Sequence, residues 1–117
     1  MTITEQKAAQ RKTGIAVRRA LSDTARTHSN AALCARIMAL DCFKKAESIL
    51  LYAAFGGEAD LSALAVEAAR QGKTLAYPVC GEGFSLTAAV PGPDGWEVGT
   101  YGIRTPILSR SEVLRPD

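Results

Sequence analysis

The chain has 117 residues and a mass of 12.4 kDa; 47% of its residues are hydrophobic, 22% are charged, and its net charge is +2. This size allows one domain with a modest core, and the composition excludes disordered, collagen-like and coiled-coil proteins. No apolar run approaches the 18 residues of a membrane span and the N-terminus lacks a signal-peptide core, so we expect a cytoplasmic protein that does not associate with membranes.

The first 46 residues are predicted to form a helical hairpin. Residues 4–21 are rich in Ala, Gln, Lys and Arg and contain no proline, which favours a helix. Ser22 occupies an N-cap position before Asp23, whose charge suits the first turn of a second helix over residues 23–40. Apolar residues of the second helix recur at spacings of three and four and are expected to face the core: Ala32, Leu33, Ile37 and Leu40.

Residues 47–80 have the order and size of a βαβ unit. The apolar run from Ser48 to Ala54 is typical of a strand buried on both faces, and residues 73–79 predict a second such strand, ended by Pro78 and Gly81. Between them lies a helix with Asp60 as the expected N-cap and Gly72 at its C-terminal end. Its core face is predicted to comprise Leu61, Leu64, Ala65, Ala68 and Ala69. The two strands of such a unit are parallel.

Residues 81–117 are predicted to contribute a strand and loops. Phe84 to Val90 favour a strand, residues 91–95 are turn formers, and Tyr101 to Pro106 favour a short extended segment. The closing residues 114–117 complete no recognisable element. The sequence therefore predicts one incomplete domain over residues 1–117, an α/β fold in which the helical hairpin packs on a small, mainly parallel sheet, as in an incomplete three-layer architecture.

Basic residues concentrate in the front half of the chain, where residues 1–50 hold nine Lys and Arg against four Asp and Glu. On the first helix, Lys7, Arg11 and Arg18 project within a stripe roughly 40° wide, and Gly14 lies beside it on the same face. Lysine and arginine on one face, beside a glycine that leaves the backbone open, suit a polyphosphate ligand. The same spacing is also common on solvated helix faces, so it does not by itself identify a site.

The turn Phe55-Gly56-Gly57-Glu58 follows the first predicted strand. Ligands of open parallel sheets bind beyond the carboxyl ends of the strands, and Glu58 would place an acceptor there for a substrate with N–H donors. A tight turn with a surface glutamate is the simpler interpretation. Cys34, Cys42 and Cys80 form no C-x-x-C pair and His28 has no neighbouring ligands at zinc spacing, so we expect buried or half-buried reduced thiols and no structural metal.

Five segments of the chain, in this order, are similar to those of the 5-formyltetrahydrofolate cyclo-ligase family. The resemblance extends over nearly the whole chain, although no one segment is highly specific. The segments are Lys7 with Arg11, Arg19-Ala20-Leu21-Ser22, Ile49-Leu50-Leu51-Tyr52 leading into Phe55-Gly56-Gly57-Glu58, the run from Gly72 to Pro78, and Tyr101-Gly102-Ile103-Arg104-Thr105-Pro106.

The resemblance implies a ligase of one-carbon metabolism that uses ATP and Mg²⁺ to convert 5-formyltetrahydrofolate into 5,10-methenyltetrahydrofolate. ATP would phosphorylate the formyl oxygen, and folate N10 would then close the ring with loss of phosphate. Lys7 and Arg11 match the ATP-binding pair of the family, and Glu58 matches its folate-contacting glutamate, with Ala53 and Phe55 lining the same pocket. The resemblance implies no metal ligand in this chain and leaves its catalytic residues and oligomeric state unknown.

Two departures from the family pattern qualify the expected activity. Thr105 stands where relatives usually have glutamate, and the glycine-rich stretch that supplies much of the ATP and magnesium site does not follow Pro106. We therefore expect impaired turnover from this chain alone. The alternatives are a small basic nucleic-acid-binding module, disfavoured because aromatic residues are few and not interleaved with basic ones, and a non-catalytic remnant that pairs with a partner through a sheet edge.

Overall fold

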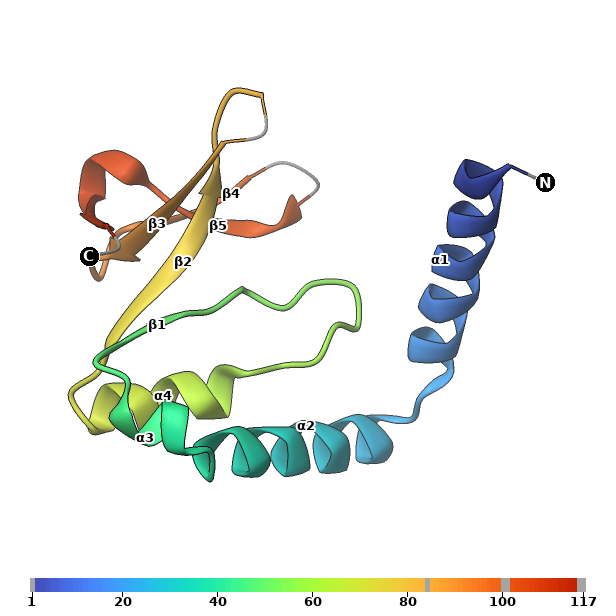
Figure 1. Ribbon diagram of the computed structural model, residues 1–117, viewed down its shortest axis with the longest axis horizontal. Helices are drawn as coiled ribbons and strands as arrows, with labels where there is room; N and C mark the ends of the chain where they lie inside the picture. Colours follow the sequence, from blue (N-terminus) through green and yellow to red (C-terminus); the bar gives the residue numbers. More distant parts are fainter. Residues whose placement is uncertain (1, 84, 100–101, 116–117) are drawn as a thin grey trace.

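A computed structural model describes residues 2–83, 85–99 and 102–115. Figure 1 shows α1 standing apart from a body in which a sheet lies over the remaining helices. In chain order the elements are α1 (Ile3–Ala20), α2 (Asp23–Met38), α3 (Asp41–Lys45), β1 (Ser48–Leu50), α4 (Ser62–Arg70), β2 (Thr74–Cys80), β3 (Leu86–Pro91), β4 (Trp96–Val98), β5 (Arg104–Pro106), the 3-10 helix η2 (Leu108–Arg110) and β6 (Ser111–Leu114).

Both N-terminal helices form as predicted, but they do not pair as a hairpin. The chain turns a corner at Leu21 and Ser22: α1 rises beside the body and is separated from it, while α2 runs beneath the sheet (Figure 1). No residue of α1 is buried, so nothing on this helix provides the apolar seam that a packed hairpin requires. The radius of gyration, 16.3 Å, accordingly exceeds the value of about 13 Å expected for a compact domain of this length.

The predicted N-cap at the start of α2 is confirmed. The Ser22 hydroxyl accepts a hydrogen bond from Ala25 N at 3.1 Å, and Asp23 lies in the first turn. The cap satisfies one of the backbone N–H groups that have no partner within the helix, and its extended conformation redirects the chain at the corner.

Replacing Ser22 with alanine should therefore lower the free energy of unfolding by about 1 kcal/mol, because the Ala25 N–H loses its acceptor. Urea denaturation followed by circular dichroism measures this loss. Ser22→Thr is the matched control, since it retains a hydroxyl at the capping position. Equal losses in the two variants would contradict the capping role of the hydroxyl.

The core face of α2 differs from the prediction. Cys34 is buried, with Ile37 and Met38 packed against the same cluster, whereas Leu33 is 37% exposed and Leu40 51% exposed. The apolar spacing identified Ile37 correctly, but the face is rotated because α4 contacts α2 along the line of Cys34. Of the three cysteines, only Cys34 is buried as predicted, while Cys42 and Cys80 are exposed thiols.

The predicted βαβ unit is confirmed by the parallel pairing of β1 with β2. Ser48 pairs with Thr74 and Leu50 with Ala76, and α4 crosses between the two strands. Gly72 has φ +80° directly after the C-cap of α4, as expected for a glycine that ends a helix. Asp60 accepts a hydrogen bond from Ser62 N at 2.9 Å, although Leu61 occupies the capping position itself.

The first strand is shorter and less covered than the sequence suggested. β1 spans three residues rather than seven, and Leu50 is 60% exposed, so the strand is not buried on both faces. Leu51 is buried and continues the ladder through a hydrogen bond from its N–H to Ala76 O at 2.8 Å. Beyond Leu51 the chain leaves the sheet and forms the loop that reaches α4.

Pro78 does not end β2, which continues to Cys80. The backbone carbonyl of Ala76 points toward β1. Backbone N–H and C=O groups of every second residue in a strand point to the same edge, so the backbone nitrogen of Pro78 also faces β1. Because β1 pairs no further than Leu51, the missing N–H of Pro78 costs no ladder hydrogen bond. The C-terminal half of β2 is therefore free to form one wall of a pocket.

The main sheet is mixed, whereas the sequence indicated a mainly parallel one. Its strand order is β1-β2-β3-β6, with β2·β3 and β3·β6 both antiparallel. The α/β class holds, and a strand that the sequence did not indicate, β6, pairs with β3, placing Ser111 opposite Pro91 and Leu114 opposite Ala88. Of the closing residues 114–117, Leu114 ends this strand, Arg115 belongs to no element, and 116–117 lie outside the described residues. A separate hairpin of β4 and β5 contacts β2, and the predicted strand residues Phe84 and Tyr101 lie outside the described part of the chain.

The core lies between the sheet and the helices α2, α3 and α4. Leu64 and Ala68 of α4 are buried as predicted, Leu61 and Ala65 pack partly against them, and Ala69 is exposed. The cluster of buried residues comprises Cys34, Phe43, Leu51, Leu64 and Ala68. None of the described helices is long and apolar enough to cross a membrane.

Candidate functional site

A pocket of about 840 Å³ opens beside the carboxyl ends of the parallel strands β1 and β2. Three segments form its walls: the loop after β1, the second half of β2, and the β4–β5 hairpin with the residues that lead into η2. The lining residues are Tyr52, Ala53, Glu58, Tyr77, Pro78, Val79, Cys80, Glu97, Gly99, Ile103, Arg104, Thr105, Pro106, Ile107, Leu108 and Ser109.

The turn that carries Glu58 is closed by two hydrogen bonds. Glu58 N donates to Phe55 O at 3.2 Å, and Phe55 N donates to Glu58 Oε1 at 2.9 Å. Gly56 and Gly57 have φ values of +63° and +82°, which residues with a side chain rarely adopt. The Glu58 carboxylate is thus held by its own turn, and no described residue donates a hydrogen bond to its Oε2.

Tyr52 fixes the other end of the same loop. Its hydroxyl donates to Ala59 O at 2.7 Å, which draws the two ends of the loop together. Burial raises the pKa of Tyr52, and the negative charges of Glu58 and Asp60 raise it further. The phenol therefore stays protonated at neutral pH and keeps donating this hydrogen bond.

Tyr77 and Arg104 also line the pocket, and Trp96 packs against both from outside the lining. The rings of Tyr77 and Trp96 meet edge to face with centroids 4.7 Å apart, and Arg104 Cζ lies 4.8 Å from the centroid of Trp96. Burial raises the pKa of Tyr77, and the positive charge of Arg104 opposes that rise. The stacking restricts the guanidinium, and among the described lining residues Arg104 is the sole cation, against the carboxylates of Glu58 and Glu97.

Ala53 and Glu58, two of the predicted substrate-binding residues, line this pocket. Phe55 does not line it and is 47% exposed. Its ring nevertheless lies at the rim, because a Cβ atom built on Gly102 would be 3.7 Å from Phe55 Cε2. The loop after β1 and the β4–β5 hairpin therefore meet at Phe55.

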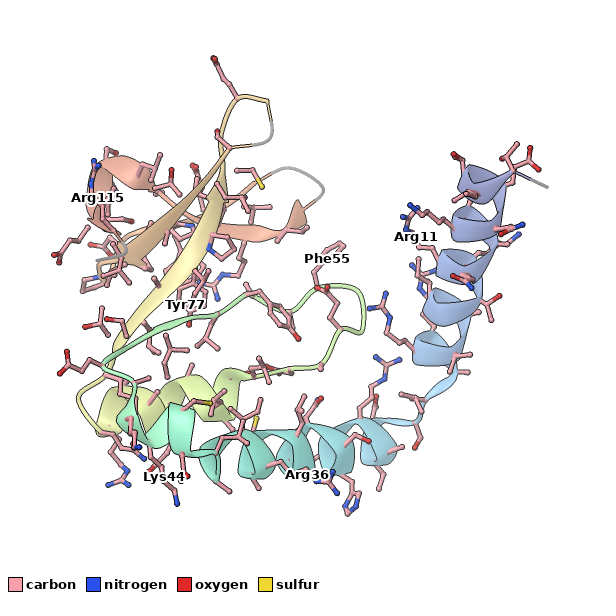
Figure 2. All side chains as sticks on the ribbon, viewed as in Figure 1. Arg11, Arg36, Lys44, Phe55, Tyr77 and Arg115 are labelled. Carbon is pink, nitrogen blue, oxygen red and sulfur yellow. The ribbon has the colours of Figure 1, made fainter. Side chains whose placement is uncertain are left out.

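Lys7 and Arg11, the predicted nucleotide-binding pair, do not line the pocket and are fully exposed on α1. Figure 2 shows Arg11 on the side of α1 that faces Phe55 and the pocket-bearing body. Lys7 lies one helical turn earlier, so it shares that side of the helix. The two cations therefore face the same region as the Glu58 turn without touching it.

The other residues on this face of α1 occupy different environments. A Cβ atom built on Gly14 would meet nothing within 4 Å, so the backbone is open at that position. Arg18, in the last turn, is half-buried, and its Nε is buried without a hydrogen-bond partner among the described residues. Arg18 O accepts a hydrogen bond from Arg26 Nη2 at 2.6 Å.

The sequence did not single out Tyr77 or Arg104 as site residues. Arg104 lies on the β4–β5 hairpin, whose strands are only three residues long and too short for a periodic signal. Tyr77 lies on the predicted second strand, but its packing against Trp96 joins it to that hairpin. Thr105, noted where the family usually has glutamate, also lines the pocket, and its Cγ2 would be 2.8 Å from a Cβ atom on Gly99. Within residues 2–83, 85–99 and 102–115, no three His, Cys, Asp or Glu side chains are grouped so as to hold a metal ion.

Comparisons with known proteins agree on one family. A model of the 5-formyltetrahydrofolate cyclo-ligase family matches residues 3–115. The NMR structure of Aquifex aeolicus 5,10-methenyltetrahydrofolate synthetase is similar to this chain, with a TM-score of 0.77 and 30% sequence identity. The alignment covers 94% of this chain and 55% of that one, so the chain spans little more than half of the solved relative's length. No curated protein matches the chain.

Proposed function

This chain belongs to the 5-formyltetrahydrofolate cyclo-ligase family, and from that premise we propose that it binds 5-formyltetrahydrofolate for ATP-dependent cyclisation to 5,10-methenyltetrahydrofolate. The observation that carries the proposal is the shared pocket of Ala53 and Glu58 at the carboxyl ends of β1 and β2. Open sheets bind ligands at this position, and the pocket volume of about 840 Å³ suits a ligand of folate size.

The two walls of the pocket suit the two ends of a folate. The pterin ring presents N–H donors, which match the acceptor Oε2 of Glu58, and the glutamate tail presents carboxylates, which match the guanidinium of Arg104. Apolar residues between them, such as Pro78, Val79 and Ile103, suit the flat rings of the ligand. In this orientation the 5-formyl group lies at the end of the pocket that Glu58 occupies.

The α1 cations would supply the phosphate contacts of the reaction. ATP transfers its terminal phosphoryl group to the formyl oxygen with release of ADP, and N10 then attacks the activated carbon as inorganic phosphate leaves. Phosphoryl transfer requires mainly positioning and charge neutralisation, which Lys7 and Arg11 offer from the side of α1 that faces the Glu58 turn. We assign no step to Mg²⁺, because no three His, Cys, Asp or Glu side chains of the described residues are grouped so as to hold a metal ion.

The proposal is tested by calorimetric titration of 5-formyltetrahydrofolate into the chain, followed by an assay of phosphate release from ATP. We expect folate binding, and phosphate release that requires 5-formyltetrahydrofolate. Slow turnover by this chain alone remains a prediction that the same assay measures. Absence of folate binding to the folded chain would refute the proposal.

Arg104 provides a specificity test of the proposed orientation. Arg104→Gln should weaken 5-formyltetrahydrofolate binding about tenfold, because one charge-assisted hydrogen bond to a tail carboxylate is lost. A pterin without the glutamate tail should bind both forms equally. Arg110→Gln is the control, because Arg110 lies outside the pocket lining. Equal weakening for both ligands would contradict a contact with the tail.

A further inference from the structure

Arg26, in the first turn of α2, connects the C-terminal end of α1 to the rest of the molecule. Its Nη2 donates to Arg18 O at 2.6 Å and its Nε donates to Leu21 O at 3.3 Å. Both acceptors lie at the C-terminal end of α1, where Arg18 O also accepts a hydrogen bond from Leu21 N at 3.3 Å. A guanidinium at that end also complements the negative pole of the helix dipole.

The same guanidinium lies against the turn that carries Glu58. A Cβ atom built on Gly57 would be 2.7 Å from Arg26 Nη1, closer than a real Cβ contact allows. A side chain at position 57 would have to displace the end of the Arg26 side chain, so glycine allows the turn and the guanidinium to lie this close. Arg26 thus touches the end of α1 on one side and the Phe55–Glu58 turn on the other.

Arg18 of α1 is itself half-buried with its Nε buried, so this end of the helix is covered there as well. The helix has no buried residue, and its C-terminal corner at Leu21 and Ser22 consists of two extended residues that do not themselves define a rigid angle. Arg26 is half-buried, and its hydrogen bond to Arg18 O is partly shielded from competing water, whereas the one to Leu21 O is exposed.

We propose that Arg26 is a positioning residue that holds α1, and with it Lys7 and Arg11, at a fixed orientation to the Glu58 turn. The inference rests on the proposed function, because it assumes that Lys7 and Arg11 bind ATP. Arg26 itself does not line the pocket. It acts by bridging two backbone carbonyls of α1 to the glycine turn, so its loss releases the helix without removing a ligand contact.

The orientation of α1 is measured directly by the distance between two spin labels. Ala8→Cys on α1 and Val66→Cys on α4 provide exposed labelling sites, in a chain whose exposed Cys42 and Cys80 are replaced by serine. We expect a narrow distance distribution for the native Arg26 and a broad one for Arg26→Ala. Arg26→Lys, which retains one cationic donor, should give an intermediate width. Arg19→Ala, an exposed cation on α1, is the control and should leave the distribution narrow.

A mutant cycle tests the contact with the turn. Gly57→Ala carries the same cost of a positive φ in either background, but the clash with Nη1 exists only when Arg26 is present. Gly57→Ala should therefore lower the urea midpoint more in the native background than in Arg26→Ala. Equal shifts would overturn the proposed contact.

Measurements of ATP binding distinguish a failure of this inference from a failure of the proposed function on which it rests. Arg26→Ala should weaken ATP binding about tenfold, and Arg26→Lys should restore part of it. An unchanged distance distribution in Arg26→Ala would overturn the positioning role whatever the ATP affinity, as would unchanged ATP affinity despite a broadened distribution. If the native chain binds no ATP, the proposed function fails. The width of the distance distribution between the spin labels still decides whether Arg26 positions α1.

Discussion

Replacing Glu58 with glutamine should weaken 5-formyltetrahydrofolate binding by roughly 10- to 100-fold, the range expected for losing charge-assisted hydrogen bonds in a shielded site. Glutamine is nearly isosteric, and its carbonyl oxygen can still accept the hydrogen bond from Phe55 N that closes the turn. The substitution therefore removes the charge and one acceptor while the loop keeps its shape. Calorimetric titration of the folate measures the effect.

The matched control for this variant is Glu82→Gln. Glu82 is an exposed glutamate in the turn between β2 and β3 and does not line the pocket. Its neutralisation changes the net charge by the same amount, so it should leave folate affinity unchanged. An equal loss of affinity in both variants would show a general charge effect and remove Glu58 from the site.

The double variant Lys7→Ala, Arg11→Ala should weaken ATP binding by roughly 100- to 1000-fold and make the residual binding less dependent on salt. Two cations four residues apart on α1 would otherwise neutralise adjacent phosphates. Alanine favours the helix at both positions, so α1 should remain intact. Fluorescence titration with a labelled ATP analogue, repeated at several salt concentrations, measures both effects.

The helix supplies its own control for that experiment. Lys12 and Arg19 project roughly 110° away from the stripe, on the basis of 100° per residue. Lys12→Ala with Arg19→Ala removes the same number of charges from the same helix. If this control pair weakens ATP binding as much as the first, the effect comes from overall charge rather than from the face that Arg11 presents to the pocket.

Local signals in the sequence predicted two helix ends and the buried face of α4. Ser22 and Gly72 define helix ends through their own chemistry, a hydroxyl acceptor and a positive φ, and neither depends on distant residues. The apolar face of α4 was likewise identified at Leu64 and Ala68. These features need only the sequence within one or two helical turns.

The βαβ pairing apart, features that depend on contacts between distant segments were not predicted. The packing of α4 selects Cys34 rather than Leu33 as the buried residue of α2, and a small apolar face cannot specify that rotation alone. The β6 strand exists because Ser111 to Leu114 pair with β3, a contact across some twenty residues. Four residues are too few to display a strand period.

The candidate site likewise contains residues that local sequence predicted and residues that depend on strand pairing. Ala53 and Glu58 follow directly from their place after the first strand, and both line the pocket. Arg104 enters the pocket only through the pairing of β4 with β5, which stacks it on Trp96. The roles of these residues, and those of Lys7 and Arg11, remain predictions that the binding experiments above address.

The separation of α1 from the body links ligand affinity to conformational entropy. An 18-residue helix without buried residues draws its order mainly from local terms and is close to the length at which isolated helices are marginal in water. A ligand that bridges α1 and the pocket restricts motion between two bodies, and this restriction opposes binding. The more rigid the corner at Leu21 and Ser22 is before the ligand binds, the smaller the entropic cost of binding becomes.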